Sequence, residues 1–409
     1  MNAAARHSLF SRFGVELEYM IVDAQSLSVR PIADELLCPA AGNLSGHVDR
    51  GRIAWSNELV AHVVELKVTE PETALEIMPA LFQTNIRDIN SLLAPLSARL
   101  MPAGMHPWMD PEHETRFWPH KYGEVYRAFD RIFGCHGHGW ANLQSAHLNL
   151  PFANDEEFAR LHAAIRLLLP ILPGLSASSP IVEGQITGLL DNRLEVYRTN
   201  SRQIAGVAGQ VIPEAVFSQA AYEAQILEPL YAEIAAHDPE GVLQEEWLNG
   251  RGAIARFSRN TIEIRILDVQ ECPQVDLAIC AAAIAVLRAL VAERWSALAL
   301  QQAVAVEPLA SVFLTAVRTA DEAVIYDDEY LRLFGYPGDS CTVGELWQHL
   351  FTAFPELTSE SSPWREPLTT IVEEGPLARR ILDALPDNDL ETVYEELCRC
   401  LEEGEIFHA

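Results

Sequence analysis

The stretch GVELEY at residues 14–19 decides the fold class, because acidic and apolar residues alternate along it. Successive side chains of a β-strand point to opposite faces, so Glu16 and Glu18 share one face and the apolar residues form the other. Two carboxylates held this close repel each other unless a cation lies between them. Mg²⁺ or Mn²⁺, which prefer oxygen ligands, would relieve that repulsion. The alternative is a strand whose polar face meets water.

Three other stretches place charged or imidazole side chains on strand-like segments, at residues 56–67, 145–150 and 261–268. These side chains are Glu58, Glu65, His147, Glu263 and Arg265. One sheet built from all four segments would present carboxylates, an imidazole and a guanidinium on one face and apolar residues on the other. Such a face is suited to hold metal ions together with an anionic substrate.

The spacing of Glu58 and Glu65 adds a geometric condition to this prediction. They are seven positions apart, so a straight strand would point them to opposite faces. Both carboxylates reach one site only if the chain bends or bulges, or if Glu58 lies on the preceding loop. We therefore predict a break in the strand between them.

The composition excludes several classes of partner. The chain has 409 residues and a formal net charge of -29, and both nucleic acid and an anionic membrane surface need basic patches that such a chain lacks. The most apolar run, at residues 277–287, is too short to span a bilayer and is typical of a buried helix. The first 13 residues contain no continuous apolar run, so we expect no signal peptide and a cytoplasmic protein.

The seven cysteines favour a reducing compartment, because their number is odd and no CxxC pair occurs. The motif CHGH at residues 135–138 could contribute ligands to a zinc ion. No second ligand pair with zinc spacing follows it, so a glycine-rich loop is the simpler interpretation.

Helical and strand patterns are mixed along the chain, which predicts an α+β fold. Helical spacing is found at residues 71–100, 154–169 and 275–300, and the section from residue 306 onward is mostly helical. Residues 101–140 are rich in Pro, His, Trp and Gly and are predicted to form loops. The alternating strands favour an antiparallel sheet with one covered face. Neither a GxxxxGK[ST] loop nor a GxGxxG turn after a strand is present, so a nucleotide would have to be held through metal ions.

The order of these motifs resembles that of the glutamate–cysteine ligase family, in particular its second group of plant-type enzymes and bacterial carboxylate–amine ligases. The resemblance covers roughly residues 10–275. It is carried by the motifs already quoted and by Ser179-Pro180-Ile181-Val182-Glu183-Gly184 followed by Arg193. Residues 374–378 (EGPLA) also resemble the end of the bacterial members.

The resemblance implies a glutamine-synthetase-like catalytic core over residues 1–305, in which the concave face of an antiparallel sheet holds metal ions and ATP and helices cover the other face. Residues 306–409 would form a helical section packed on that core. The implied ligands of Mg²⁺ or Mn²⁺ are Glu16, Glu18, Glu58, Glu65, His147 and Glu263. Arg265 would contact the transferred phosphoryl group, so it and Glu263 are the implied catalytic residues. Arg193, Glu183 and Asn149 are the implied substrate contacts.

The resemblance also implies a reaction. ATP would activate the γ-carboxylate of glutamate as an acyl phosphate, and an amine, with cysteine as the default, would displace phosphate to give a γ-glutamyl amide. Two alternatives stay open: a guanidino kinase, which shares this type of sheet, and a non-catalytic relative that binds a nucleotide or metabolite. A homodimer is compatible with the family.

Overall fold

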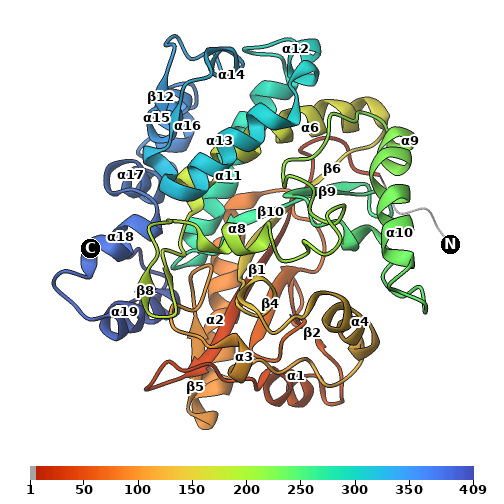
Figure 1. The fold of residues 1–409 in the computed structure, drawn as a ribbon. Coiled ribbons are helices and arrows are strands. Elements are labelled where there is room, and N and C mark those ends of the chain that lie inside the picture. Colours follow the sequence, from red (N-terminus) through yellow and green to blue (C-terminus); the bar gives the residue numbers. More distant parts are fainter. Residues whose placement is uncertain (1–5) are drawn as a thin grey trace.

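The computed structural model of the protein describes residues 6–409 and contains an eight-stranded antiparallel sheet. The strand order is β2-β3-β4-β1-β6-β10-β9, and β5 also pairs with β1. Figure 1 shows this sheet passing through the middle of the molecule. Its strands are β1 (Gly14–Asp23), β2 (His47–Asp49), β3 (Ile53–Asn57), β4 (Val63–Val68), β5 (Ala98–Met101), β6 (Ser145–Pro151), β9 (Ala253–Arg256) and β10 (Thr261–Asp268).

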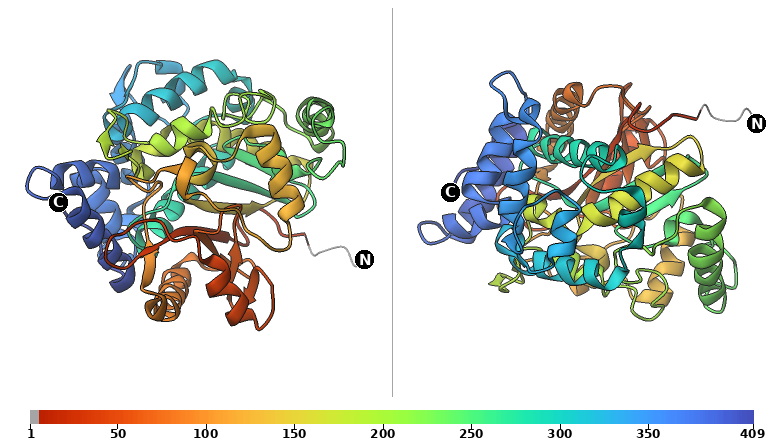
Figure 2. Two further views of the ribbon diagram at one scale, coloured as in Figure 1. Left: turned by 60° about the horizontal axis from the view of Figure 1, so that its bottom comes forward. Right: turned by 90° about the horizontal axis from the view of Figure 1, so that it is seen from above.

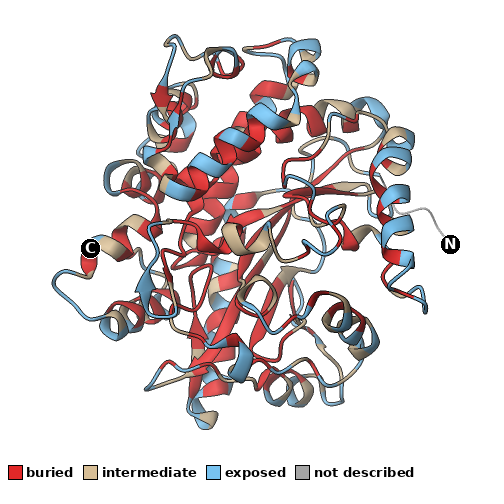
Figure 3. Ribbon diagram, in the orientation of Figure 1, coloured by how far each residue is buried: buried red, intermediate tan, exposed pale blue. Residues whose placement is uncertain are grey.

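The apolar face of the sheet is covered by α2 (Met78–Leu93), α6 (Asp155–Leu168) and α11 (Pro273–Val291). Val15 and Leu17 of β1 are fully buried in the same hydrophobic core as residues of all three helices. Burial of this face supplies the main stabilising free energy of such a layer. The buried central strands and helices stand out in Figure 3. The predicted α+β fold, an antiparallel sheet with helices on one face, is confirmed.

Helix α11 is the one helix within residues 6–409 that is long and apolar enough to cross a membrane by length and composition. Of its most apolar 18-residue window, 78% is buried inside the fold. It contains the run at residues 277–287, so the expectation of a buried helix is confirmed.

The break predicted between Glu58 and Glu65 is confirmed. Strand β3 ends at Asn57, Glu58 lies on the following loop, and Glu65 is in β4, which returns antiparallel to β3. The loop leaves the sheet's hydrogen-bonding pattern, so the odd spacing no longer separates the two carboxylates onto opposite faces.

Several predicted boundaries were wrong. Helix α2 ends seven residues before the predicted limit of 100, and the chain then turns through Ser97, in the left-handed region, into β5. Helix α11 ends at Val291 rather than near residue 300. The stretch 101–140 contains short helices among its loops: α3 (Pro111–Glu114), α4 (Gly123–Phe133) and α5 (His138–Ala141).

The section after residue 305 is mostly helical, as predicted, with one small sheet. It contains α13 (Val306–Thr319), β11 (Val324–Ile325), α14 (Asp328–Arg332), β12 (Cys341–Thr342), α15 (Val343–Thr352), α16 (Pro355–Thr358), α17 (Arg365–Glu374), α18 (Leu377–Ala384) and α19 (Leu390–Glu403). Figure 2 shows the C-terminal helices gathered along one side of the sheet layer. Helices α13, α15 and α17 contribute to the same core as the sheet, and α19 contacts β5 and α2. The division into two units at residue 305 stays a prediction.

The remaining elements lie around the sheet or in its connections. They are α1 (Ala33–Ala41), α7 (Pro173–Ser176), the hairpin of β7 (Ile181–Val182) and β8 (Gln185–Ile186), α8 (Asn192–Tyr197), α9 (Gln219–Tyr222), α10 (Glu228–Ala235) and α12 (Leu298–Ala303).

Candidate active site

A cavity of about 490 Å³ opens on the face of the sheet opposite α2, α6 and α11. We call it the acidic cavity. Seven residues predicted from the sequence line it, and they come from β1, β4, β6, β10 and the loop after β3. They are Glu16, Glu18, Glu58, Glu65, His147, Glu263 and Arg265. Of the predicted site residues, Arg193, Glu183 and Asn149 do not line it.

The strand register brings these residues together. Glu18 of β1 is paired with Glu65 of β4, and Glu16 is paired with His147 of β6. Residues paired directly across an antiparallel sheet have Cβ atoms about 4.5–5.5 Å apart. The register therefore places two carboxylates side by side and a third beside an imidazole, on one rigid surface.

Hydrogen bonds fix the orientation of Glu16 and Glu18. Both the backbone N–H and the hydroxyl of Ser145 donate to Glu18 Oε2, each at 2.8 Å. His147 Nδ1 lies 3.3 Å from Glu16 Oε2, and the Asn149 amide donates to Glu16 Oε1 at 3.2 Å. Asn149 thus acts on Glu16 rather than on the cavity itself, and its predicted substrate contact stays a prediction that this geometry does not support.

Glu58 and Glu65 complete the acidic side of the cavity. Glu65 is buried and accepts hydrogen bonds from the Ser56 hydroxyl and the Lys67 ammonium. Two groups of side chains bring one ligand atom each to within 4.8 Å of one another: Glu16, Glu65 and His147, and Glu18, Glu58 and Glu65. Oxygen-rich groups of this kind match the ligand preference of Mg²⁺ or Mn²⁺.

The pKa shifts show how unfavourable this concentration of negative charge is. Burial, and then the charge of Glu16, raise the pKa of Glu65 to about 7. Burial, and then the charges of Glu65 and Glu18, raise the pKa of Glu58 well above its ordinary value. Burial alone would lower the pKa of His147, yet the surrounding carboxylates raise it to about 9. The raised pKa values mean that Glu58, Glu65 and His147 tend to hold protons among the neighbouring carboxylates. A divalent cation bound there would displace these protons, so the donor set fits a metal ion.

Glu263 lies between two guanidinium groups. Its carboxylate is 3.0 Å from Arg265 Nη2 and 3.0 Å from Arg256 Nη1. Strand β10 has a bulge between Ile264 and Leu267, where Arg265 and the next residue face the single residue His147 of β6. Arg265 is on the cavity face with Glu263 because the two residues are two positions apart, and the bulge that follows lets the consecutive apolar residues Ile266 and Leu267 both be buried.

Arg193 lies at the start of α8 and does not line the acidic cavity. Its guanidinium is 2% exposed and paired with the fully buried Asp268, which also accepts from the hydroxyl of Ser179 at 2.8 Å. Its terminal nitrogens lie 3.5 Å from the backbone carbonyl of Arg265. The contacts in this structure are therefore those of a residue that supports the β10 bulge, and the predicted substrate contact stays untested.

Glu183 lies on the turn between β7 and β8, and its side chain is 72% exposed. Its carboxylate lies 3.3 Å from His138 Nε2. It points to no residue of the acidic cavity in this structure, so a substrate contact there would require the turn to move.

The zinc alternative at residues 135–138 finds no support in the part of the chain that the structure describes. Cys135 is buried among apolar residues, and burial raises the pKa of its thiol. Among residues 6–409, no group of metal-ligating side chains within 4.8 Å includes this motif.

Sequence reasoning missed the basic and aromatic side of the cavity. It is formed by Lys67, Lys121, Tyr122, Tyr126, Trp247, Arg256 and Arg259. Lys67 could have been found, because it follows Glu65 by two residues on β4 and so shares its face. The others lie on separate segments whose approach depends on tertiary packing.

Comparisons with known proteins agree with this fold. A sequence model of glutamate–cysteine ligase family 2 matches residues 12–399. A protein of Archaeoglobus fulgidus with no functional name is 33% identical over 397 residues, covering 96% of this chain and 99% of that protein. A glutamate–cysteine ligase of Halobacterium salinarum is 27% identical over 277 residues, covering 64% of this chain and 65% of that protein.

The structural comparison is more distant and shows a likeness of fold. The crystal structure of the Francisella tularensis glutamate–cysteine ligase in complex with AMP aligns with a TM-score of 0.57 at 10% sequence identity, over 98% of this chain and 90% of that chain. Because the family match spans nearly all of the sequence, this chain belongs to glutamate–cysteine ligase family 2.

Proposed function

We propose that this protein is an ATP-dependent carboxylate–amine ligase that joins the γ-carboxylate of glutamate to an amine, with cysteine as the first acceptor to test. One observation carries the proposal: five carboxylates from three strands and one loop converge with an imidazole and a guanidinium in one cavity. Membership of a ligase family supports the coarser class, a carboxylate–amine ligase. A cytoplasmic location and a homodimer stay predictions.

The proposed reaction has two steps, a phosphoryl transfer and an attack by the amine. A carboxylate oxygen of glutamate attacks the γ-phosphorus of ATP, the bond to the β-phosphate oxygen breaks, and ADP leaves. The amine nitrogen then attacks the acyl carbon, phosphate leaves with the bonding electrons, and the nitrogen loses a proton. A protein accelerates such steps mainly by aligning the reactants and neutralising charge on the phosphoryl oxygens.

The acidic residues would hold the metal ions of this reaction. Glu16, Glu65 and His147 would form one ligand group and Glu18, Glu58 and Glu65 the other. Bound Mg²⁺ or Mn²⁺ would supply positive charge to the phosphate oxygens of ATP. Ser145 and Asn149 orient two of these carboxylates by hydrogen bonds before any substrate binds.

Arg265 would act on the transferred phosphoryl group. It lines the cavity at the β10 bulge, and its planar guanidinium can donate two hydrogen bonds to an anion. Its pairing with Glu263 holds it beside the ligand groups until substrate competes for it. Removal of one such charged contact typically costs about 3 kcal/mol of transition-state stabilisation.

The assay combines the protein, ATP, Mg²⁺, glutamate and a panel of amines, and follows ADP release and product mass. The proposal expects ADP release that depends on an amine, together with a γ-glutamyl amide. A phosphoguanidine product would instead support the guanidino kinase. ATP binding without any turnover across the panel would contradict the ligase and favour the non-catalytic relative.

A further inference from the structure

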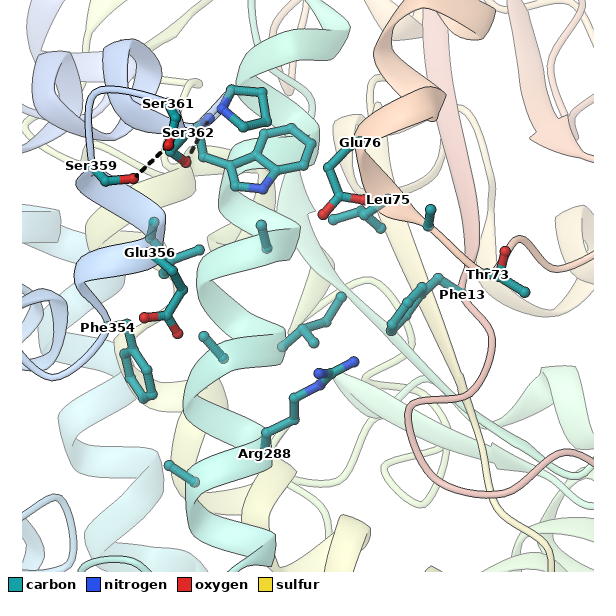
Figure 4. A pocket seen from close by; sticks show the side chains of 18 of the residues that line it. Phe13, Thr73, Leu75, Glu76, Arg288, Phe354, Glu356, Ser359, Ser361 and Ser362 are labelled. Atoms are coloured by element: carbon teal, nitrogen blue, oxygen red, sulfur yellow. Dashed lines mark hydrogen bonds between the residues drawn. The ribbon is translucent and has the colours of Figure 1, made fainter.

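A second cavity, of about 730 Å³, lies on the helix-covered side of the sheet and is larger than the acidic cavity. Helix α11 forms its floor. The segment before β1 and residues 73–76 form one wall, and residues 354–364 form the other. Figure 4 shows these walls facing each other across α11, with Phe13 on one side and Phe354 on the other. We call it the α11 groove. Its volume is in the range of small-molecule sites.

The sequence of α11 explains why the α11 groove is open. The residues that line it recur at helical spacing along one face of α11, and several of them are alanines, including Ala281, Ala285 and Ala289. Alanine side chains are too short to reach the neighbouring walls, so an apolar strip remains between them. An apolar ligand body laid on this strip would gain free energy by leaving water.

Two guanidinium groups are fixed at the rim of the α11 groove by aromatic rings. Arg288 Cζ lies 5.4 Å from the ring centre of Phe10 and 5.9 Å from that of Phe13, and its Nη2 lies 3.4 Å from the Phe10 carbonyl oxygen. Arg294 Cζ lies 5.4 Å from the ring centre of Phe354, and its Nη1 donates to the carbonyl of Ala353 at 3.2 Å. These contacts position each charge before any ligand arrives.

Neither guanidinium has a carboxylate within 4.0 Å among residues 6–409, although the chain carries 58 acidic against 29 basic residues. Glu76 and Glu356 also line the α11 groove. Both are exposed, and neither makes a side-chain hydrogen bond in the part of the chain that the structure describes. The positive groups are therefore held in place, whereas the negative groups can turn toward water.

We infer that the α11 groove binds a small amphipathic anion, a carboxylate with an aliphatic or aromatic body. The body would lie on the alanine strip of α11, and the head group would contact Arg288, with Arg294 nearby at the same rim. The hydroxyls of Ser359, Ser361 and Ser362 on the opposite wall offer further donors. This site is independent of the ligase proposal, because none of its residues lines the acidic cavity.

Calorimetric titration of the full chain with decanoate, decanol and decyltrimethylammonium, each below its micelle concentration, tests the inference. We expect decanoate to bind with a dissociation constant below about 1 mM and the other two at least about tenfold more weakly. Absence of decanoate binding at that concentration would overturn the site. Equal binding of decanol or tighter binding of the cation would overturn the anionic class.

Two variants locate the binding. Ala285→Phe fills the alanine strip and should abolish decanoate binding. Arg288→Met keeps the stem of an exposed side chain but removes its charge, so decanoate binding should weaken at least about tenfold while decanol binding stays unchanged. The exposed Arg318→Met on α13 is the matched control and should bind decanoate as the wild type does. Unchanged decanoate binding in Arg288→Met would contradict the inference even if Ala285→Phe does not fold.

Discussion

The pKa values of single residues in the acidic cavity depend on their neighbours in the sheet more than on the residue type. Burial and the charge of Glu16 raise the pKa of Glu65, while contact with His147 overcomes the effect of burial on Glu16 and lowers its pKa. The sequence predicts that Glu16 and Glu18 share a face, because that depends only on strand alternation. It does not predict that Glu65 lies across from Glu18, because register is set by tertiary packing.

The Glu16→Gln substitution should reduce ligase turnover at least about 100-fold, because it removes a carboxylate charge from the proposed metal site. His147 and Asn149 hold that carboxylate in position in the wild type. ADP release in the proposed assay measures the effect, and circular dichroism checks that the fold is intact. The matched control is Glu307→Gln, which removes one exposed carboxylate on α13 and should keep full activity. Activity in Glu16→Gln equal to that of the control would remove Glu16 from the site.

The Asp268→Asn substitution should lower the free energy of unfolding by about 3–5 kcal/mol, because it leaves the buried Arg193 guanidinium without its partner. Glu183→Gln is exposed and should change the same quantity by less than about 0.5 kcal/mol. Urea unfolding of both variants makes the comparison. A small effect in Asp268→Asn would contradict a structural role for the Arg193–Asp268 pair.

At the scale of elements, regular segments were predicted well and irregular ones were not. The start of α6 was predicted from Asn154, which caps the helix by accepting from the Glu157 N–H at 3.0 Å. Strand β5 was missed because its four residues continue an apolar pattern after α2, and only the turn at Ser97 separates them. The bulge in β10 falls where the alternation of residues 261–268 breaks, at the consecutive apolar residues Ile266 and Leu267, but such a break alone does not distinguish a bulge from the end of a strand.

Helix α6 supports a prediction on pH. His162 is fully buried, and burial lowers its pKa to about 3 from an ordinary value of 6.5. As the pH falls below about 6.5, the unfolded chain takes up a proton at this residue and the folded chain does not. Proton uptake stabilises the unfolded chain, so the free energy of unfolding decreases as the pH is lowered. Relative to His162→Leu, the wild type should lose about 2–3 kcal/mol of unfolding free energy between pH 7 and pH 4.5.

Urea unfolding of the wild type and His162→Leu at a series of pH values tests this prediction. The exposed His237→Leu serves as control and should follow the wild type at every pH. A difference between wild type and His162→Leu that stays constant from pH 7 to pH 4.5 would contradict the prediction.

At the scale of the whole molecule, the C-terminal section and the sheet share one hydrophobic core. The fully buried Trp347 of α15 donates its ring N–H to the Ile171 carbonyl at 2.9 Å, and Phe313 of α13 belongs to the same core. Arg380 of α18 is paired with the buried Glu271, which follows β10. The sequence predicted that the section after residue 305 is mostly helical, but not how much apolar surface it shares with the sheet, because that depends on packing between distant segments.

The full chain should therefore unfold in one cooperative transition, and a fragment of residues 1–305 should show none, because its shared core would be exposed to water. Far-UV circular dichroism and tryptophan fluorescence during urea unfolding measure both proteins. Two separate transitions in the full chain, or a sharp transition in the fragment, would instead support independent units that meet near residue 305.

The central claim is that the acidic residues of the cavity hold divalent cations, and the binding of Mn²⁺ measured by electron paramagnetic resonance tests it most directly. We expect the wild type to bind Mn²⁺ and its affinity to fall below pH 7, because protons compete at Glu65, whose pKa is raised to about 7. Glu65→Gln should weaken binding at least about tenfold, and Glu307→Gln should leave it unchanged. Wild-type protein that binds no Mn²⁺, or Glu65→Gln that binds it equally well, would contradict the account.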